Sequence, residues 1–537
     1  MSLNRRDFLV TAGAAGAAAA LGAELAASPA AAQDHVLSIA LAARAPSGLN
    51  PQQTGLTGGD NWAISQIFDC LVHADDGTFA ITPADFRPGL AESFESSADA
   101  KTWTYKLRPG VKFHKGYGEV TADDVLFTFG RLLDPKTPTS SKALYLNIDK
   151  IEAVDPMTVR FTLKLPDPLF NGAAVCTLPA SILSKKAFTE KGEDGFKFDP
   201  IGTGAYQVSK VDPNSSVYLE ANPDYFQGPA ASKNVKITFI ADTTARTLAF
   251  LSGQVDMMEG ARTPGWIPGI KQRAPKTIFD ETKPGSFNHL MLNLTKKPLD
   301  DLRVRQAFRY AIDNAAIARA YGELAVPMVG MIAPQFAGSV KVEDLPPELQ
   351  YKPDVEKAKK LLADAGFPNG VTIECFTSQR EDYAAIMLMI QEQLRKAGIN
   401  LNMKIIDHAT FHSQTAKDLN AIALNSSSYP PVPTQPLLDQ LSSKSVVKPD
   451  GHGGTNFSHY GVAMPGVDDL LTQAVGEPDF DKRIALVQQI EKQVLTDLPD
   501  MGIITLSYVI ARSPRVDLGY EVKSGYAYWP LHRAKYA

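Results

Sequence analysis

The stretch that decides the fold class runs from residue 354 to residue 406 and reads DVEKAKKLLADAGFPNGVTIECFTSQREDYAAIMLMIQEQLRKAGINLNMKII. Apolar residues recur at helical spacing in 355–365 and again in 383–394. They alternate with polar residues in 371–375 and in 401–405, which is typical of strands. A strand, a helix and a second strand in this order form a crossover unit. This unit predicts a parallel pair of strands in a covered sheet, and therefore an α/β fold.

The same kinds of pattern continue towards the N-terminus. Alternating apolar residues predict strands at 103–108 and 159–163. Thr121 and Asp124 have the spacing of a capping pair at the start of a helix, and Pro135 ends that helix. No internal repeat is evident, so the chain is expected to consist of different α/β units rather than copies of one unit.

Length and composition narrow the classes of function. The 537 residues suggest about three domains of ordinary size. The formal net charge is −5 with no basic segment, which argues against a nucleic-acid partner. Three cysteines, at positions 70, 176 and 375, form neither a disulfide framework nor a four-thiolate zinc site, and they are expected to be small buried side chains.

The first 32 residues read as an export signal. Arg5 and Arg6 precede Asp7-Phe8-Leu9 and a mildly apolar run of Ala, Gly and Leu, a pattern that resembles a twin-arginine signal. Small residues up to Ala32 predict cleavage there, and an uncleaved membrane anchor is the alternative. No cysteine precedes position 70, so the mature protein is expected to be periplasmic and not lipid-anchored.

Several blocks occur in a fixed order that resembles the signature of one family, the family 5 extracellular solute-binding proteins. These proteins are the periplasmic components of peptide, nickel and opine ABC importers. The blocks are LAESFE at 90–95, WTYKLRPGVKFH at 103–114, TADDV at 121–125, GTGAY at 202–206, NPDYF at 222–226, DLRVRQA at 301–307 and AKKLLADAG at 358–366.

The resemblance implies an α/β, periplasmic binding protein-like two-lobed clamp with an additional domain. It divides the chain into a signal at 1–32, domain I at 33–80, 200–292 and 505–537, domain II at 81–199, and domain III at 293–504. Hinge closure would trap a peptide-like or other small polar solute between the lobes.

The implied partner is an ABC permease in the inner membrane, with its separate ATPase, because no Walker motif occurs in this chain. The chain is expected to be a monomer, to use no cofactor and to catalyse no reaction. A sensory binding protein that presents its solute to a chemoreceptor or kinase is one alternative, and a secreted hydrolase is a less favoured one. The sequence leaves the identity of the solute open.

The loop at 425–433 departs from the pattern of peptide-binding relatives, in which an aspartate binds the α-ammonium group of the peptide. Asn425 stands where those relatives have tryptophan, Ser428 stands where they have that aspartate, and Ser427 and Tyr429 lie beside them. Hydroxyl and amide groups suit a neutral polar or an anionic solute better than an ammonium group. The alternative is a loop that is merely stiffened by proline.

Other candidate ligand contacts are aromatic or amide residues. Asn61 and Trp62 follow a glycine-rich loop at 55–59, although Trp62 would equally fill a core. Two regions contribute the remaining candidates: Phe287 and Asn288 lie near the expected hinge, and Phe457 lies with its neighbours Asn456 and Tyr460 in a glycine-rich loop.

Metal binding and catalysis find little support. His408 and His412 have helical spacing, but no Glu or Cys stands at ligand spacing, so no metal site is expected there. The GHGG stretch at 451–454 resembles an oxyanion loop, yet the chain contains no G-x-S-x-G to supply a nucleophile.

Overall fold

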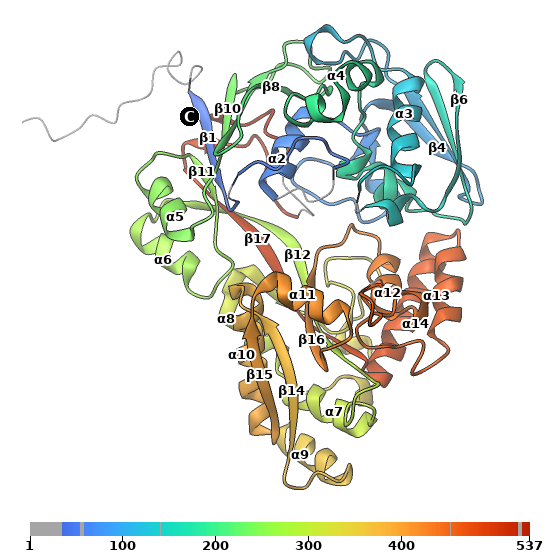
Figure 1. Cartoon of the computed structure of the whole chain (residues 1–537), viewed down its shortest axis with the longest axis vertical. Helices are drawn as coiled ribbons and strands as arrows, with labels where there is room; N and C mark the ends of the chain where they lie inside the picture. The colour runs from blue at the N-terminus through green and yellow to red at the C-terminus, as the bar shows by residue number, and fades with distance from the viewer. Residues whose placement is uncertain are drawn as a thin grey trace, which may run out of the picture.

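Two lobes make up the protein, and two long strands join them (Figure 1). The structure, a computed structural model, describes residues 35–536 apart from 44, 54–57, 140, 452 and 525–528. The joining strands are β12 (Ile278–Leu292) and β17 (Asp500–Arg512), which pair antiparallel. We call residues 35–277 and 513–536 the first lobe and residues 293–499 the second lobe.

The largest sheet runs through both lobes. In the described part of the chain it has nine strands, and its central strand β17 is buried along nearly its whole length, as expected for a strand that is covered on both faces. In spatial order these strands are β16 (Ile422–Ser427), β12, β17, β11 (Met257–Glu259), β1 (Val36–Leu41), β10 (Asn234–Phe239), β9 (Ser216–Ala221) and β8 (Tyr206–Asp212), with β13 (Ala325–Pro327) paired to β17.

The first lobe holds a second sheet, of four strands, in the order β4 (Ala91–Ser96), β5 (Thr102–Leu107), β7 (Thr158–Leu163) and β6 (Ile148–Asp155). Helix α3 (Ala122–Leu133) packs on it and starts with the predicted capping box, in which the Thr121 amide donates to Asp124 Oδ2 at 3.0 Å. The predicted strands at 103–108 and 159–163 are confirmed.

The crossover unit that decided the fold class is present in the second lobe. Its elements are β14 (Val371–Ser378), α10 (Glu381–Lys396) and β15 (Ile399–Ile406), preceded by α9 (Val355–Asp364). β14 and β15 pair in parallel from Val371↔Ile399 to Ser378↔Ile406, so the prediction of a parallel pair is confirmed. The two strands therefore end at the same edge of the lobe.

The remaining helices cover the sheets, and two short strand pairs lie in the first lobe. The helices are α2 (Gly58–Ile67), α4 (Lys185–Phe198), α5 (Thr243–Leu251), α6 (Trp266–Arg273), α7 (Leu302–Ala311), α8 (Asn314–Tyr321), α11 (His408–Ala416), α12 (Thr434–Leu441), α13 (Val467–Gly476) and α14 (Phe480–Asp497). The short pairs are β2 (Val72–His73) with β3 (Arg87–Pro88), and β18 (Val516–Asp517) with β19 (Lys535–Tyr536).

The pairing of β12 with β17 is interrupted between the lobes. The register shifts between Thr282 and Ser286, and Gly285 adopts a φ of 68° in the interruption. A Cβ at Gly285 would lie 2.2 Å from the carbonyl oxygen of Leu506, so only glycine fits there. The two lobes are thus joined through a strand pair that is regular on either side and irregular in between. The boundaries of domains I, II and III remain a prediction.

Candidate functional site

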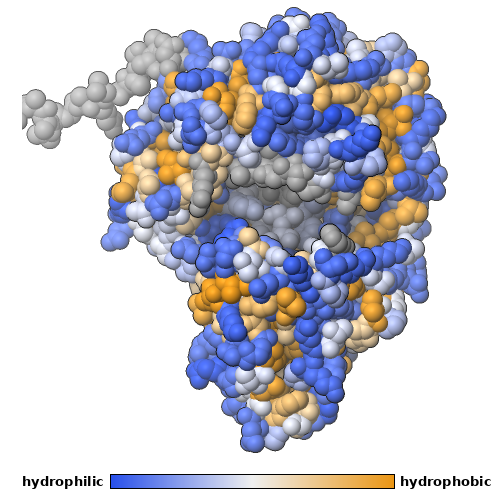
Figure 2. All heavy atoms as spheres, viewed as in Figure 1, coloured by the Kyte–Doolittle hydropathy of each residue, from blue (hydrophilic) through white to orange (hydrophobic). Residues whose placement is uncertain are grey.

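The candidate site lies at the edge of the second lobe that faces the first. Figure 2 shows the molecule hollowed between the two lobes, and Figure 1 shows α11, which follows β15, at this edge of the second lobe. Since β14 and β15 are parallel, their carboxyl ends open on this side. Side chains that follow the carboxyl ends of parallel strands are the usual ligand contacts in α/β proteins.

A buried aspartate at this edge binds two arginines. Arg380, which follows β14, donates from Nε to Asp382 Oδ1 at 3.1 Å and from Nη2 to Asp382 Oδ2 at 2.7 Å. Arg262, from the first lobe, donates from Nη2 to the same Oδ2 at 2.7 Å. Asp382 is held at the start of α10, so one carboxylate links an arginine of each lobe.

Aromatic and hydroxyl groups surround Arg262. Its guanidinium carbon lies 4.4 Å from the ring centre of Tyr508, and its Nη1 donates to Ser286 Oγ at 3.0 Å. The Tyr508 hydroxyl lies 3.3 Å from the hydroxyl of Ser428. Ser286 and Tyr508 belong to β12 and β17, so the strands that join the lobes contribute directly to this cluster.

The two histidines of α11 lie beside the arginine cluster. His408 Nδ1 is 2.8 Å from Ser378 Oγ, and the ring centres of His408 and His412 are 4.5 Å apart. Burial, with Arg380 nearby, lowers the pKa of both histidines, so both are neutral at pH 7. Within the described residues, no group of three or more His, Cys, Asp or Glu side chains is arranged to hold a metal ion.

The two arginines and the aspartate that bind one another carry together one net positive charge. Two guanidinium groups face one carboxylate, and the side chain of Arg380 is 50% exposed whereas that of Asp382 is 9% exposed. Burial acts to lower the pKa of Arg380, but Asp382 outweighs it and the pKa is raised. Arg380 can therefore present hydrogen-bond donors and a positive charge to an anion in the hollow.

The loop predicted to contact the solute lies next to this cluster, at the end of β16. Ser427 and Ser428 are half-buried, whereas Asn425 is buried and accepts a hydrogen bond from Ser427 Oγ at 3.2 Å. Tyr429 is buried too, and its hydroxyl accepts from Gln440 Nε2 at 2.6 Å. The loop thus offers amide and hydroxyl groups without a carboxylate.

The aromatic candidates lie mainly in cores. Trp62 is fully buried and donates from Nε1 to the carbonyl oxygen of Trp529 at 2.9 Å, which is the core role that the sequence left open for it. Phe287 is also buried, with Tyr429 and Phe336 around its ring. The expectation that Trp62 and Phe287 present an aromatic face to a solute is therefore not supported by their placement.

The remaining candidates differ in exposure. Asn61 on α2 is half-buried, and part of the glycine-rich loop before it lies outside the described residues. Phe457 is half-buried, while Asn456 donates to the carbonyl oxygens of Ser442 and Tyr460 and so holds the turn of this loop. Asn288 is buried between β12 and β17, where it donates to the Ile504 carbonyl at 3.2 Å.

No motif in the sequence points to the arginine cluster as a whole. Arg380 and Asp382 follow a strand that was correctly predicted to be parallel, and that position was a usable signal. Arg262 and Tyr508 lie far from them in sequence, in segments with no motif, so only the folded structure brings them together.

Comparison with known proteins agrees with this architecture. The family model "Bacterial extracellular solute-binding proteins, family 5 Middle" matches residues 85–447, and a twin-arginine translocation signal model matches residues 2–22. A solved structure of MoaA from A. tumefaciens R10, in complex with mannopinic acid, has 33% sequence identity and a TM-score of 0.77, covering 93% of this chain and 99% of that one.

Two curated relatives are binding proteins by name. Heme-binding protein A of Haemophilus influenzae is 27% identical over 90% of each chain. The glutathione-binding protein GsiB of Escherichia coli K12 is 31% identical over 59% of this chain and 60% of its own length.

The fold is that of a periplasmic binding protein. The chain belongs to the family 5 bacterial extracellular solute-binding proteins. It is the solute-binding component of an ABC import system, exported to the periplasm on a twin-arginine signal that itself lies outside the described residues. Among the described helices, none has the length and apolar character that crossing a bilayer requires. The position of signal cleavage, after Ala32, stays a prediction.

Proposed function

We propose that this protein captures a small polar solute through a carboxylate of that solute, which binds Arg380 as the lobes close. The observation that carries the proposal is a half-exposed guanidinium, oriented by the buried Asp382 and joined through that carboxylate to Arg262 of the first lobe. A bidentate arginine–carboxylate contact provides both affinity and orientation.

The hydroxyl and amide groups of the loop at the end of β16 complete this site. Ser427 and Ser428, which are half-buried, can donate to and accept from a solute without adding charge, whereas Asn425 is buried behind them. The loop at 425–433 itself carries no carboxylate to pair with an α-ammonium group, and burying that group unpaired would be costly. The site therefore favours an acid over a free peptide amine.

The relatives support the same chemical class. Mannopinic acid and glutathione, which appear in the names of two of them, are small polar molecules that carry carboxylates. We infer that the chain works as a monomer, performs no bond-making and delivers its solute to an ABC permease. Its affinity need only be micromolar, about −8 kcal/mol, to serve this purpose.

Calorimetry with a matched panel tests the proposal. Mannopinic acid, glutathione and the dipeptide Met-Leu are titrated, and whichever binds is repeated as its N-acetyl derivative and as its carboxamide. We expect N-acetylation to leave the affinity within about threefold and amidation to abolish binding. The reverse result, binding that requires the free amine but not the carboxylate, would overturn the proposal.

A second measurement covers the case in which no member of the panel binds. The purified protein is denatured and its co-purified small molecules are identified by mass spectrometry. A tightly held solute with no acidic group would contradict the proposal equally well.

A further inference from the structure

The two lobes meet at a second arginine–aspartate contact, which the candidate site does not use. Arg483, on α14 of the second lobe, donates from Nη1 to Asp167 Oδ1 of the first lobe at 3.0 Å. Its Nη2 donates to the carbonyl oxygen of Pro166 at 2.9 Å. The Arg483 side chain is 2% exposed and that of Asp167 is 14% exposed, so this contact is sealed from water.

Each partner is also held by its own lobe. Arg483 donates from Nε to the Glu477 carbonyl at 3.0 Å and from Nη2 to the Val475 carbonyl at 2.7 Å, at the end of α13. Asp167 Oδ1 accepts from the backbone amide of Leu169 at 3.0 Å. Both groups are thus oriented before they meet, which reduces the entropy that is lost when the lobes come together.

Apolar contacts between the lobes accompany this pair. The rings of Phe79 and Phe336 are in edge contact with their centres 5.8 Å apart. Val432 lies 3.8 Å from the place that a Cβ on Gly172 would take. In Figure 1, α13 and α14 lie below the β4–β7 sheet, to the right of the joining strands. The lobes are therefore in contact away from the strands that connect them.

The energetics make this contact selective rather than strongly stabilising. Burial raises the pKa of Asp167 and lowers that of Arg483, and each partner opposes the effect of burial on the other. A buried ion pair gains little net free energy, because desolvation offsets the attraction. If one partner is removed, however, the other is left as an uncompensated buried charge, and the closed arrangement becomes unfavourable.

We propose that Arg483 and Asp167 are positioning residues, a latch that gives the lobes a measurable population of the arrangement in which this pair is formed before any solute is present, a population that solute binding at Arg380 then increases. The inference rests on the closure proposed above, and it extends that proposal to residues that contact no solute. Solute affinity is then set jointly by the arginine cluster at the hollow and by this distant pair.

A double-mutant cycle on the distance between the lobes tests the latch. Spin labels are attached at Lys136→Cys in the first lobe and at Lys417→Cys in the second, both exposed positions. Burial raises the pKa of the three native thiols, so the introduced cysteines react first at pH 7. Pulsed electron paramagnetic resonance then gives the distance distribution of the protein in the absence of any solute.

The four chains compared are the parent, Arg483→Met, Asp167→Asn and the double variant. The parent is expected to populate the short distance of the closed arrangement. Each single variant should lower that population at least fivefold, and the double variant should restore it to within about twofold of the parent. A parent with no closed population, or four identical distributions, would overturn the inference.

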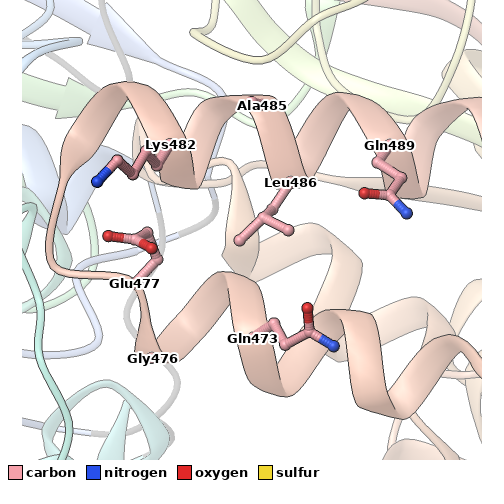
Figure 3. Close-up of a pocket in the computed structure, with 7 residues that line it drawn as sticks. All are labelled: Gln473, Gly476, Glu477, Lys482, Ala485, Leu486 and Gln489. Atoms are coloured by element: carbon pink, nitrogen blue, oxygen red, sulfur yellow. The ribbon is translucent and has the colours of Figure 1, made fainter.

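The matched control is Lys482→Met, one residue from Arg483. Lys482 is exposed and lines the open groove of about 590 Å³ between α13 and α14, where its side chain points away from the helix (Figure 3). It should leave the distribution unchanged, and a shift as large as that of Asp167→Asn would contradict the latch.

Two further features keep the result decisive. Arg483→Met also removes bonds within the second lobe, so thermal unfolding identifies any loss of folding, and Asp167→Asn then carries the test. Because no solute is present, failure of the latch would leave the proposal for Arg380 intact, and the titrations above test that proposal separately.

Discussion

Two arginine–aspartate contacts join the lobes, and they use the same ionic chemistry in opposite ways. Beside the joining strands, Arg262 reaches Asp382, whose carboxylate is shared with the half-exposed Arg380. Below the β4–β7 sheet, Arg483 reaches Asp167, and the hydrogen bonds of its guanidinium go to buried carbonyl and carboxylate oxygens.

The difference between the two pairs is the basis for proposing that one binds a solute and the other positions the lobes. The first pair leaves donors and a positive charge facing the hollow, because one carboxylate serves two cations. The second pair leaves little hydrogen-bonding capacity unused and is sealed from water. It therefore forms only when the two lobes are in contact. Exposure and the number of partners separate the two roles, whereas residue type does not.

The largest expected effect comes from Gly285, on which both contacts depend because it lies where β12 passes between the lobes. Gly285→Ala should reduce the free energy of unfolding by roughly 3–5 kcal/mol, since its φ is 68° and the new Cβ would meet the Leu506 carbonyl. Urea unfolding followed by circular dichroism measures this.

Gly269→Ala is the control for Gly285→Ala. It lies in the helix α6 with open space around it, and alanine there should stabilise the protein by about 0.5–1 kcal/mol. Equal effects of the two substitutions would show that the interrupted pairing of β12 and β17 is not a constraint.

Helix α14 carries a second buried ionisable residue, and its titration is expected to affect stability. Glu491 is fully buried, and burial raises its pKa to about 7, although the backbone amides of Ile332 and Met331 oppose the rise. A folded-state pKa above the unfolded one gives stability that is complete below about pH 4.5 and is lost as the pH rises through 7.

Glu491→Gln removes this titration. The free energy of unfolding of the parent minus that of the variant should therefore fall by on the order of 3 kcal/mol between pH 4.5 and pH 8. Denaturant unfolding at a series of pH values gives the difference, and a flat or rising curve would mean that the carboxyl is ionised in the fold.

Arg380→Ala tests the contact that is proposed for the carboxylate of the solute. Loss of the exposed guanidinium should weaken binding of a carboxylated solute about 30-fold, or about 2 kcal/mol, with little change in stability. Arg395→Ala, at the other end of the same helix α10 and paired only with exposed Glu392, should leave the affinity unchanged. Calorimetry with the panel solute that binds compares the two, and equal affinities would place the solute elsewhere.

The smallest effect concerns the hydroxyl beside Arg262. Tyr508→Phe keeps the ring that faces the Arg262 guanidinium and removes only the 3.3 Å contact with Ser428, so stability should change by less than about 0.5 kcal/mol. A thermal melt with a loss beyond that value would show that the hydroxyl pair, rather than the ring, holds Arg262 in place.

The fold could be predicted largely from local pattern. The capping box at Thr121, the strand around Trp103 and the parallel pair β14–β15 are all as predicted, because each depends on residues a few positions apart. The order of the sheet was not predictable in the same way. β12 pairs with β17 although more than 200 residues separate them, and hydrophobic alternation does not encode that partner.

The candidate site was only partly predicted. The loop of Ser427 and Ser428 lies beside the arginine cluster, and its departure from the peptide-binding pattern predicted a neutral polar or anionic solute. Trp62 was ambiguous, since an indole fills a core as readily as it lines a hollow, and the carbonyl of Trp529 that accepts its N–H is remote in sequence.

What the chain determines by itself is local: an export signal, the α/β alternation, the caps and the order of the family blocks. What only the tertiary structure decided is which charges meet across the lobes and how much water reaches them. Arg380 and Arg483 cannot be told apart from the sequence alone. Burial, which depends on every element packed around a side chain, leaves the first half-exposed, as the proposed solute contact requires, and seals the second between the lobes.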